Sequence, residues 1–190
     1  AHPHLDCKGL VAVVHNGVIE NFLELKNELI EKGHNFVSRT DTEVIPHLIE
    51  EELNKGFDFY TATINAIKRL KGSYALAIIS TKEPDKIICV RNESPLVIGI
   101  ADDGLYCASD IPAILPYTNK IISLKNGEIA ILTKDKYEIR RLSDGAIVTR
   151  EPQIIDWTID MAEKQGYPHF MLKEIHEQPQ SLRNALRLQE

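Results

Sequence analysis

The chain has 190 residues, of which 43% are hydrophobic and 26% charged, and its formal net charge is −6. These values are typical of one globular domain with a sizeable core, and they argue against a nucleic-acid-binding surface, which would be basic. No apolar run approaches the ~20 residues that cross a bilayer, and three widely spaced cysteines suit no disulfide framework, so we expect a cytoplasmic protein that binds neither membrane nor nucleic acid.

A buried strand and a turn come first along the chain. The apolar run 10–14 predicts the strand. Asn16-Gly17 predicts the turn, because glycine accepts a positive φ and asparagine tolerates it. The pair presents an amide side chain and a backbone N–H together, as an oxyanion hole requires. An ordinary hairpin turn has the same sequence, so both interpretations stay open here.

Three helices are expected next. The first begins at Asn21, which with Glu24 resembles a capping box. The second begins after Thr42, and this start places Pro46 at the fourth helical position, where it removes at most one hydrogen bond. The third covers about residues 58–70.

The hydrophobic period changes after the third helix. Residues 74–79 are apolar at successive positions, which predicts a central strand covered on both faces. Short turns join this strand to further candidates and indicate antiparallel pairing. The order of helices, strands and a final helix predicts an α+β layered domain with helices on both outer faces. The further strands are expected at 87–90, 96–100, 105–108, 121–124, 128–132 and 137–142.

The last quarter reads as a connection followed by helix. Residues 150–168, with Trp157 and Gly166, indicate the connection. The final helical pattern is expected to break, with Pro179 starting a second helix. The sequence starts without a leader, and its final helical pattern ends without a glycine or proline that would stop a helix. We therefore expect a piece of a longer protein. We assign 1–150 to one domain and 151–190 to a helical segment and linker.

The histidines allow a metal site as one interpretation. His2 and His4 share one side of an extended segment, and His15, His34 and His47 lie elsewhere. Zinc takes three or four such ligands. The proline between the first two histidines restricts their geometry and no acidic residue has ligand spacing, so the prediction is that no metal binds.

A cysteine hydrolase is another interpretation, with Cys7 as nucleophile and His15 as base. A reactive thiol needs a lowered pKa, whereas the neighbouring Asp6 would raise the pKa of Cys7. An inert, partly buried cysteine is therefore favoured. Cys89 and Cys107 lie within apolar strands and are expected in the core.

Asp41 stands at a predicted helix start. A carboxylate there can bond the first backbone N–H groups, or it can hold a substrate ammonium group. Position alone does not choose between these roles, and capping is the more common one. A pure binding module is a third class of function that the chain allows.

Taken together, several segments resemble the glutaminase domain of class II glutamine amidotransferases, which are N-terminal-nucleophile hydrolases. Within that class, two of the segments resemble enzymes that join the glutaminase domain to a sugar-isomerase domain. The matching segments are 1–4, 14–21 and 40–44 for the class, and 94–99 with 108–110 and 169–179 for the sugar-isomerase group.

The resemblance implies a fold and a set of site residues. The fold would be a four-layer αββα sandwich of antiparallel sheets, incomplete at its N-terminus. An amino-terminal cysteine would attack the glutamine amide with its own α-amine as base. The side chain of Asn16 and the N–H of Gly17 would bind the oxyanion, Asp41 would hold the α-amino group of glutamine, and His4 would line the pocket.

The resemblance also implies partners. Ammonia would pass to an isomerase domain of the same polypeptide that converts fructose 6-phosphate to glucosamine 6-phosphate, in a parent enzyme that is a homodimer. No metal and no organic cofactor is implied.

The cysteine nucleophile of the family precedes the segment that matches Ala1. Cys7 is not N-terminal and lies in the wrong segment. We therefore expect residues 1–190 alone to be inactive. Two alternatives stay open: a non-catalytic interaction or regulatory module with this fold, and the glutaminase domain of another class II amidotransferase.

Overall fold

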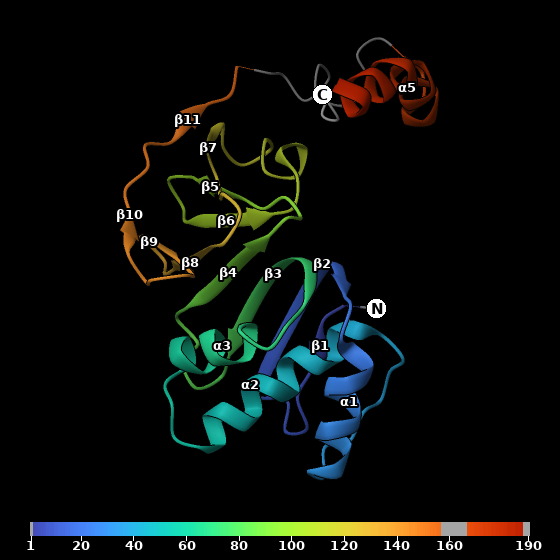
Figure 1. Cartoon of the computed structure of the whole chain (residues 1–190). Coiled ribbons are helices and arrows are strands. Elements are labelled where there is room, and N and C mark those ends of the chain that lie inside the picture. The colour runs from blue at the N-terminus through green and yellow to red at the C-terminus, as the bar shows by residue number, and fades with distance from the viewer. Residues whose placement is uncertain (1, 157–166, 188–190) are drawn as a thin grey trace.

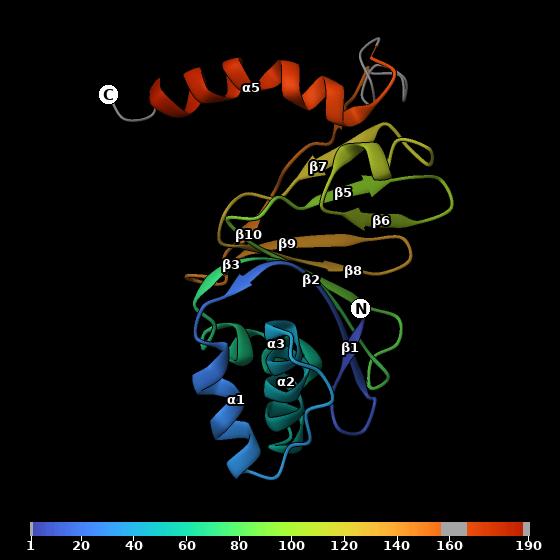
Figure 2. The ribbon, with the colours of Figure 1, turned by 90° about the vertical axis from the view of Figure 1, so that its right-hand side faces the viewer.

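The computed structural model describes residues 2–156 and 167–187, and it consists of layers (Figure 1). Three helices cover one face of a large sheet, a smaller sheet packs on its other face, and a last helix lies beyond the smaller sheet (Figure 2). This order confirms the predicted α+β sandwich of antiparallel sheets. The helices are α1 (Phe22–Glu31), α2 (Val44–Asn54), α3 (Phe59–Ile67) and α5 (Phe170–Arg187), with 3-10 turns η1 (Asp41–Glu43) and η2 (Ile111–Ala113).

Seven strands form the larger sheet, in the order β1-β2-β3-β4-β8-β9-β10, with every neighbouring pair antiparallel. The smaller sheet has four antiparallel strands in the order β11-β7-β5-β6. The strands of the first sheet are β1 (His4–Leu5), β2 (Val11–Ile19), β3 (Gly72–Ser80), β4 (Ile87–Asn92), β8 (Glu128–Leu132), β9 (Tyr137–Arg141) and β10 (Ile147–Val148), and those of the second are β5 (Val97–Ile100), β6 (Leu105–Ala108), β7 (Lys120–Ser123) and β11 (Gln153–Ile154).

The central strand β3 is covered on both faces, as its sequence predicts. Tyr74, Leu76 and Ile78 belong to the core between the larger sheet and the helices. Ala75 and Ala77 belong to the core between the two sheets. Successive side chains of a strand point to opposite faces, so this alternation places bulky residues under the helices and small ones under the second sheet.

The prediction of a turn at Asn16-Gly17 is wrong. Both residues lie inside β2, where Asn16 pairs with Ala75 and Gly17 with Tyr74. Gly17 has a φ of +132°, and a Cβ built there would lie 2.0 Å from the carbonyl oxygen of Ser73. Glycine is therefore needed here for its conformation and for the close approach of β3, and not for a chain reversal.

The predicted capping box at Asn21 is also wrong. Its side chain makes no cap hydrogen bond to α1. The amide donates to the carbonyl oxygen of Arg69 and accepts from the N–H of Lys71, each at 2.9 Å. Asn21 thus ties the start of α1 to the segment that enters β3.

Both proline positions differ from the prediction. The second helix starts as η1 at Asp41, and Pro46 is the third residue of α2, where a helix needs no N–H donor. Pro179 does not start a new helix but lies inside α5, which continues to Arg187. A proline inside a helix removes one N–H donor and destabilises the helix by about 3 kcal/mol. The remaining hydrogen bonds of this 18-residue helix keep α5 continuous through Pro179.

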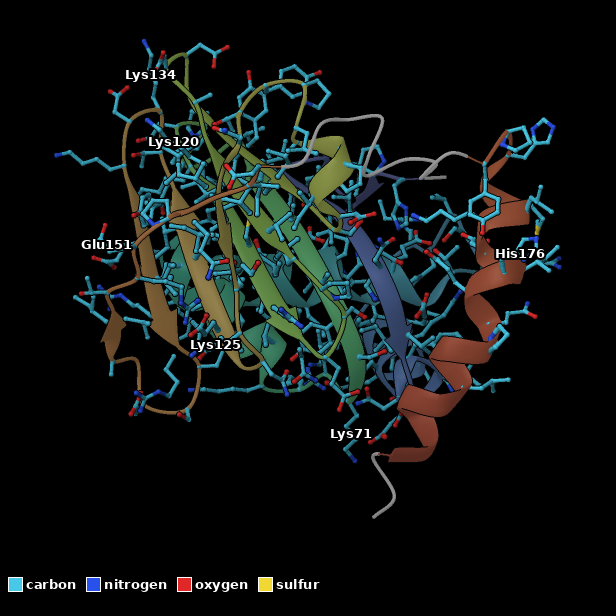
Figure 3. All side chains as sticks on the ribbon, turned by 90° about the horizontal axis from the view of Figure 1, so that it is seen from above. Lys71, Lys120, Lys125, Lys134, Glu151 and His176 are labelled. Atoms are coloured by element: carbon cyan, nitrogen blue, oxygen red, sulfur yellow. The ribbon has the colours of Figure 1, made fainter. Side chains whose placement is uncertain are left out.

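The carboxyl-terminal part adds strands that the sequence did not indicate. β10 pairs with β9, and β11 pairs with β7 within the segment expected to be a connection. Trp157 and Gly166 of that connection lie outside the described residues. Lys120, Lys134 and Glu151 lie at the edge of the molecule that is opposite to His176 of α5 (Figure 3). Within residues 2–156 and 167–187, no helix is both long and apolar enough to span a bilayer.

Candidate active site

A hollow of about 200 Å³ opens between the middle of β2, the facing part of β3 and the end of β6. Asn16 lines this hollow and also the neighbouring one, which Arg91 and Asp110 border. The amide side chain of Asn16 therefore stands where the two spaces meet. The first hollow is lined by His2, Val14, His15, Asn16, Ala75, Ala77, Leu96, Cys107, Ala108 and Ser109.

Asn16 lines the hollow, and Gly17 follows it directly in β2. The buried-exposed alternation of β2 stops here, since residues 16, 17 and 18 are all exposed. Pairing with β3 holds the strand still on one side. A side-chain amide and a following backbone N–H fixed in this way are donors that need little reorganisation when negative charge develops beside them.

Asp41 is joined to the same strand. Its Oδ2 accepts a hydrogen bond of 2.7 Å from the N–H of Ile19, at the end of β2. Asp41 is the first residue of η1, and the cap position belongs to Thr40. The capping role for Asp41 is therefore wrong. No hydrogen bond to Oδ1 is found among the described residues. Asp41 does not line the hollow with Asn16.

His15 anchors η1 against β2. Its Nδ1 lies 2.9 Å from Oγ1 of Thr42, while Nε2 is buried and has no hydrogen-bond partner within the described part of the chain. Burial lowers the pKa of His15, and the negative charge of Asp41 offsets part of that effect. The imidazole is therefore neutral near pH 7 and serves as a polar contact between the two elements.

His4 is buried in β1 beside β2 and contacts the residue before Asp41. Its Nε2 lies 3.2 Å from Oγ1 of Thr40. Burial lowers the pKa of His4, and the nearby His2 lowers it further. His4 does not line the hollow with Asn16, so the structure places it on the side of η1.

Glu43 is a site residue that the sequence analysis missed. Its carboxylate accepts from the N–H groups of Val37 and Ser38 at 2.7 Å each, and from Oγ of Ser38 at 2.5 Å. The side chain is 1% exposed. These bonds fix the loop that leads to Thr40 and Asp41. The Asp-Thr-Glu run at a helix start was the one sequence signal that could have indicated it.

Cys7 and His15 are not brought together, so a nucleophile and base pair of these two residues is wrong. Cys7 lies in the turn between β1 and β2 and is exposed, so the expectation that it is partly buried is wrong. Its Sγ lies 3.5 Å from Nδ1 of His34 and of His47. Burial raises the pKa of its thiol, and the charge of Asp6 adds to this as expected. Cys89 is buried, as predicted, whereas Cys107 is half-buried and lines the hollow.

Comparisons with known proteins agree with this arrangement. A family model described as a glutamine amidotransferase domain matches residues 1–116, more than half of the chain. A glutamine–fructose-6-phosphate aminotransferase (isomerizing) of Thermococcus kodakarensis is 57% identical over 186 residues, and one of Methanothermobacter thermautotrophicus is 52% identical over 188 residues.

Each of these alignments covers 98% of this chain but 31% of the relative, so the chain spans about a third of the length of the curated relatives. A solved structure of the glutamine phosphoribosylpyrophosphate amidotransferase from B. subtilis is similar in fold, with a TM-score of 0.61 and 25% identity. That alignment covers 80% of this chain and 36% of the other.

Proposed function

This chain belongs to the family of glutamine amidotransferase domains, and on that premise we propose that it hydrolyses the side-chain amide of glutamine and releases ammonia. The observation that carries the proposal is the placement of Asn16 at the hollow, with Gly17 next to it in a strand that β3 holds by pairing. Their two N–H donors suit the tetrahedral intermediate of acyl transfer.

The chemistry requires a thiolate that attacks the amide carbon of glutamine. The carbonyl oxygen then becomes an oxyanion, which the Nδ2 group of Asn16 and the N–H of Gly17 stabilise. Collapse of the intermediate expels ammonia, and water releases glutamate from the thioester. By resemblance the thiolate is that of an amino-terminal cysteine. Cys7 is poorly suited to this role, because its thiol has a raised pKa and contacts the imidazoles of His34 and His47.

Substrate binding falls to the side of η1. Oδ1 of Asp41 is available to accept a hydrogen bond from the α-ammonium group of glutamine, while Oδ2 remains bonded to Ile19. A charge-assisted bond of this kind contributes about 1.5–3 kcal/mol. His4 supports the same face through Thr40.

The larger enzyme is proposed from the names and lengths of the relatives. Ammonia released here passes to a sugar-isomerase domain of the same polypeptide, where fructose 6-phosphate becomes glucosamine 6-phosphate. Residues 1–150 form the glutaminase domain, and residues 151–190 lead toward the isomerase domain. A homodimer is proposed from the resemblance alone, and a cytoplasmic setting from cysteine usage.

Product analysis tests the proposal. Full-length protein given glutamine and fructose 6-phosphate should form glutamate and glucosamine 6-phosphate in equal amounts. Residues 1–190 alone should release no glutamate, and joining them to an amino-terminal segment with the cysteine should restore glutamate release. Failure of the full-length protein to hydrolyse glutamine would instead favour a non-catalytic module with this fold.

A further inference from the structure

A second group of chemically reactive side chains lies where three segments meet beside the larger sheet. Cys7 comes from the turn between β1 and β2, and His34 from the loop after α1. His47 and Glu50 lie three residues apart on one face of α2. His34, His47 and Glu50 are buried, with exposed fractions of 8%, 1% and 4%, whereas Cys7 is exposed. The proposed glutaminase chemistry uses none of the four.

The four potential ligand atoms converge on one point. Sγ of Cys7 lies 3.5 Å from Nδ1 of His34 and 3.5 Å from Nδ1 of His47, and the two Nδ1 atoms lie 3.2 Å apart. Oε2 of Glu50 lies 3.2 Å from Nδ1 of His34 and 3.7 Å from Nδ1 of His47. One ligand atom from each of the four residues thus lies within 4.8 Å of all the others.

These separations match a tetrahedral metal centre. A zinc ion with bonds of about 2.3 Å to sulfur and about 2.0–2.1 Å to nitrogen and oxygen holds its ligand atoms about 3.3–3.6 Å apart. The printed distances scatter closely around that range. Hydrogen bonds alone account less well for these four short separations. If the two Nδ1 atoms share one hydrogen, the thiol of Cys7 and the carboxylate of Glu50 must both find a partner on those same two nitrogens.

The surrounding groups suit metal-bound histidines. The second ring nitrogen of a ligating histidine generally donates to a carboxylate. Nε2 of His34 lies 3.0 Å from Oε1 of Glu51 and follows this pattern. Nε2 of His47 lies 3.8 Å from Oε1 of Glu43, too far for a hydrogen bond, and has no hydrogen-bond partner within the described part of the chain. The carboxylate of Glu51 therefore favours the tautomer of His34 in which Nδ1 is free to bind a cation.

The surroundings of the Cys7 sulfur and the charges of Cys7 and Glu50 also favour a bound cation. The N–H of Asn35 points at Sγ of Cys7 from 3.5 Å, a contact that favours a thiolate. Burial and the charge of Glu50 raise the pKa of this thiol. A bound divalent cation would instead lower the pKa of this thiol. The two negative charges of one thiolate and one carboxylate would then neutralise the two positive charges of the cation.

We propose that Cys7, His34, His47 and Glu50 bind one zinc ion in a closed tetrahedral site. Four protein ligands leave no open position, so the role is structural. Binding releases the thiol proton as the Zn–S bond forms. The ion would join the β1–β2 turn, the loop after α1 and α2, and so fix the segments that carry His4 and Asp41.

Metal content is the first test. Full-length protein without a histidine tag, purified without chelator, should retain one zinc per chain by mass spectrometry. Cys7→Ser and His47→Gln should each lose it. The matched controls Cys107→Ser and His176→Gln should keep it. Substoichiometric zinc in the parent protein, or equal loss in the controls, would overturn the proposal.

Cobalt substitution keeps the test open if the Cys7 and His47 variants do not fold. Zinc-depleted parent protein loaded with Co²⁺ should show the intense visible bands of a tetrahedral site and a sulfur-to-cobalt charge-transfer band. Glu51→Gln retains all four ligands and should weaken zinc affinity about 10–100-fold. A cobalt spectrum without the sulfur band would overturn the proposal, because Cys7 would then not be a ligand. Unchanged zinc affinity in Glu51→Gln would contradict the support that Glu51 gives to His34.

Discussion

Replacing Gly17 with alanine should disturb β2 through one methyl group. The new Cβ would lie 2.0 Å from the carbonyl oxygen of Ser73 and 2.9 Å from Cα of Tyr74, so backbone must move. The positive φ adds about 1–2 kcal/mol of strain, and overpacking adds about 1–3 kcal/mol. We therefore expect Gly17→Ala to lower the free energy of unfolding by about 2–5 kcal/mol.

Gly33→Ala is the matched control. Gly33 also has a positive φ, +93°, but a Cβ there meets no heavy atom within 4 Å. Only the strain of about 1–2 kcal/mol should then apply. Urea unfolding followed by circular dichroism measures both variants, and each kcal/mol corresponds to about 2–4 °C in Tm for a chain of this size. Equal destabilisation by the two substitutions would refute the argument from close approach of β3.

Two further predictions concern η1. Asp41→Asn keeps an oxygen for the hydrogen bond from Ile19 but loses the charge that binds the ammonium group, so KM for glutamine should rise about 10–100-fold. The control Asp85→Asn should leave KM unchanged, and a fall in kcat alone in Asp41→Asn would contradict the binding role. Burial raises the pKa of Glu43, but bonds from Ser38 and Val37 outweigh it and hold the pKa below 4.5. The folded state then binds fewer protons than the unfolded state, so stability is present above pH 4.5 and is lost as the pH falls. Urea unfolding at a series of pH values should show a smaller acid loss in Glu43→Gln than in the parent, and an equal loss would contradict this.

Elements with a clear hydrophobic period could be predicted from sequence. The continuous apolar run of β3 indicated its central place, because only a strand covered on both faces can bury both sets of side chains. The turn at 102–104 indicated the antiparallel pair of β5 and β6. The turn at 126–127 instead joins β7 to β8, which lie in different sheets, so antiparallel pairing across this turn was predicted wrongly. Information of this kind is local, so no partner elsewhere in the chain is needed to read it.

Residues whose partners are distant in sequence were misread. Asn16-Gly17 has the composition of a turn, but pairing with β3 keeps it inside a strand. Asn21 has the composition of a helix cap, but its amide bonds the backbone at residues 69 and 71. In each case a tertiary contact overrides the local preference, and a single sequence does not reveal that contact.

The proposed catalytic residues and the proposed metal ligands differ in how well the sequence alone could indicate them. Asn16, Gly17 and Asp41 could be selected because they fall in motifs. The cysteine-histidine cluster is assembled from three separate segments, and only His47 and Glu50, three residues apart on a helix, carry a spacing signal. The absence of ligand-spaced acidic residues, assumed from the sequence, is therefore wrong.

The most direct test of the proposed oxyanion hole is the kinetics of Asn16→Ala in full-length protein that hydrolyses glutamine. Loss of one fixed donor should lower kcat about 10²–10³-fold with little change in KM, while Asn54→Ala, on the exposed end of α2, should match the parent. A rise in KM with unchanged kcat would contradict the assignment, because Asn16 would then bind substrate and not the developing charge.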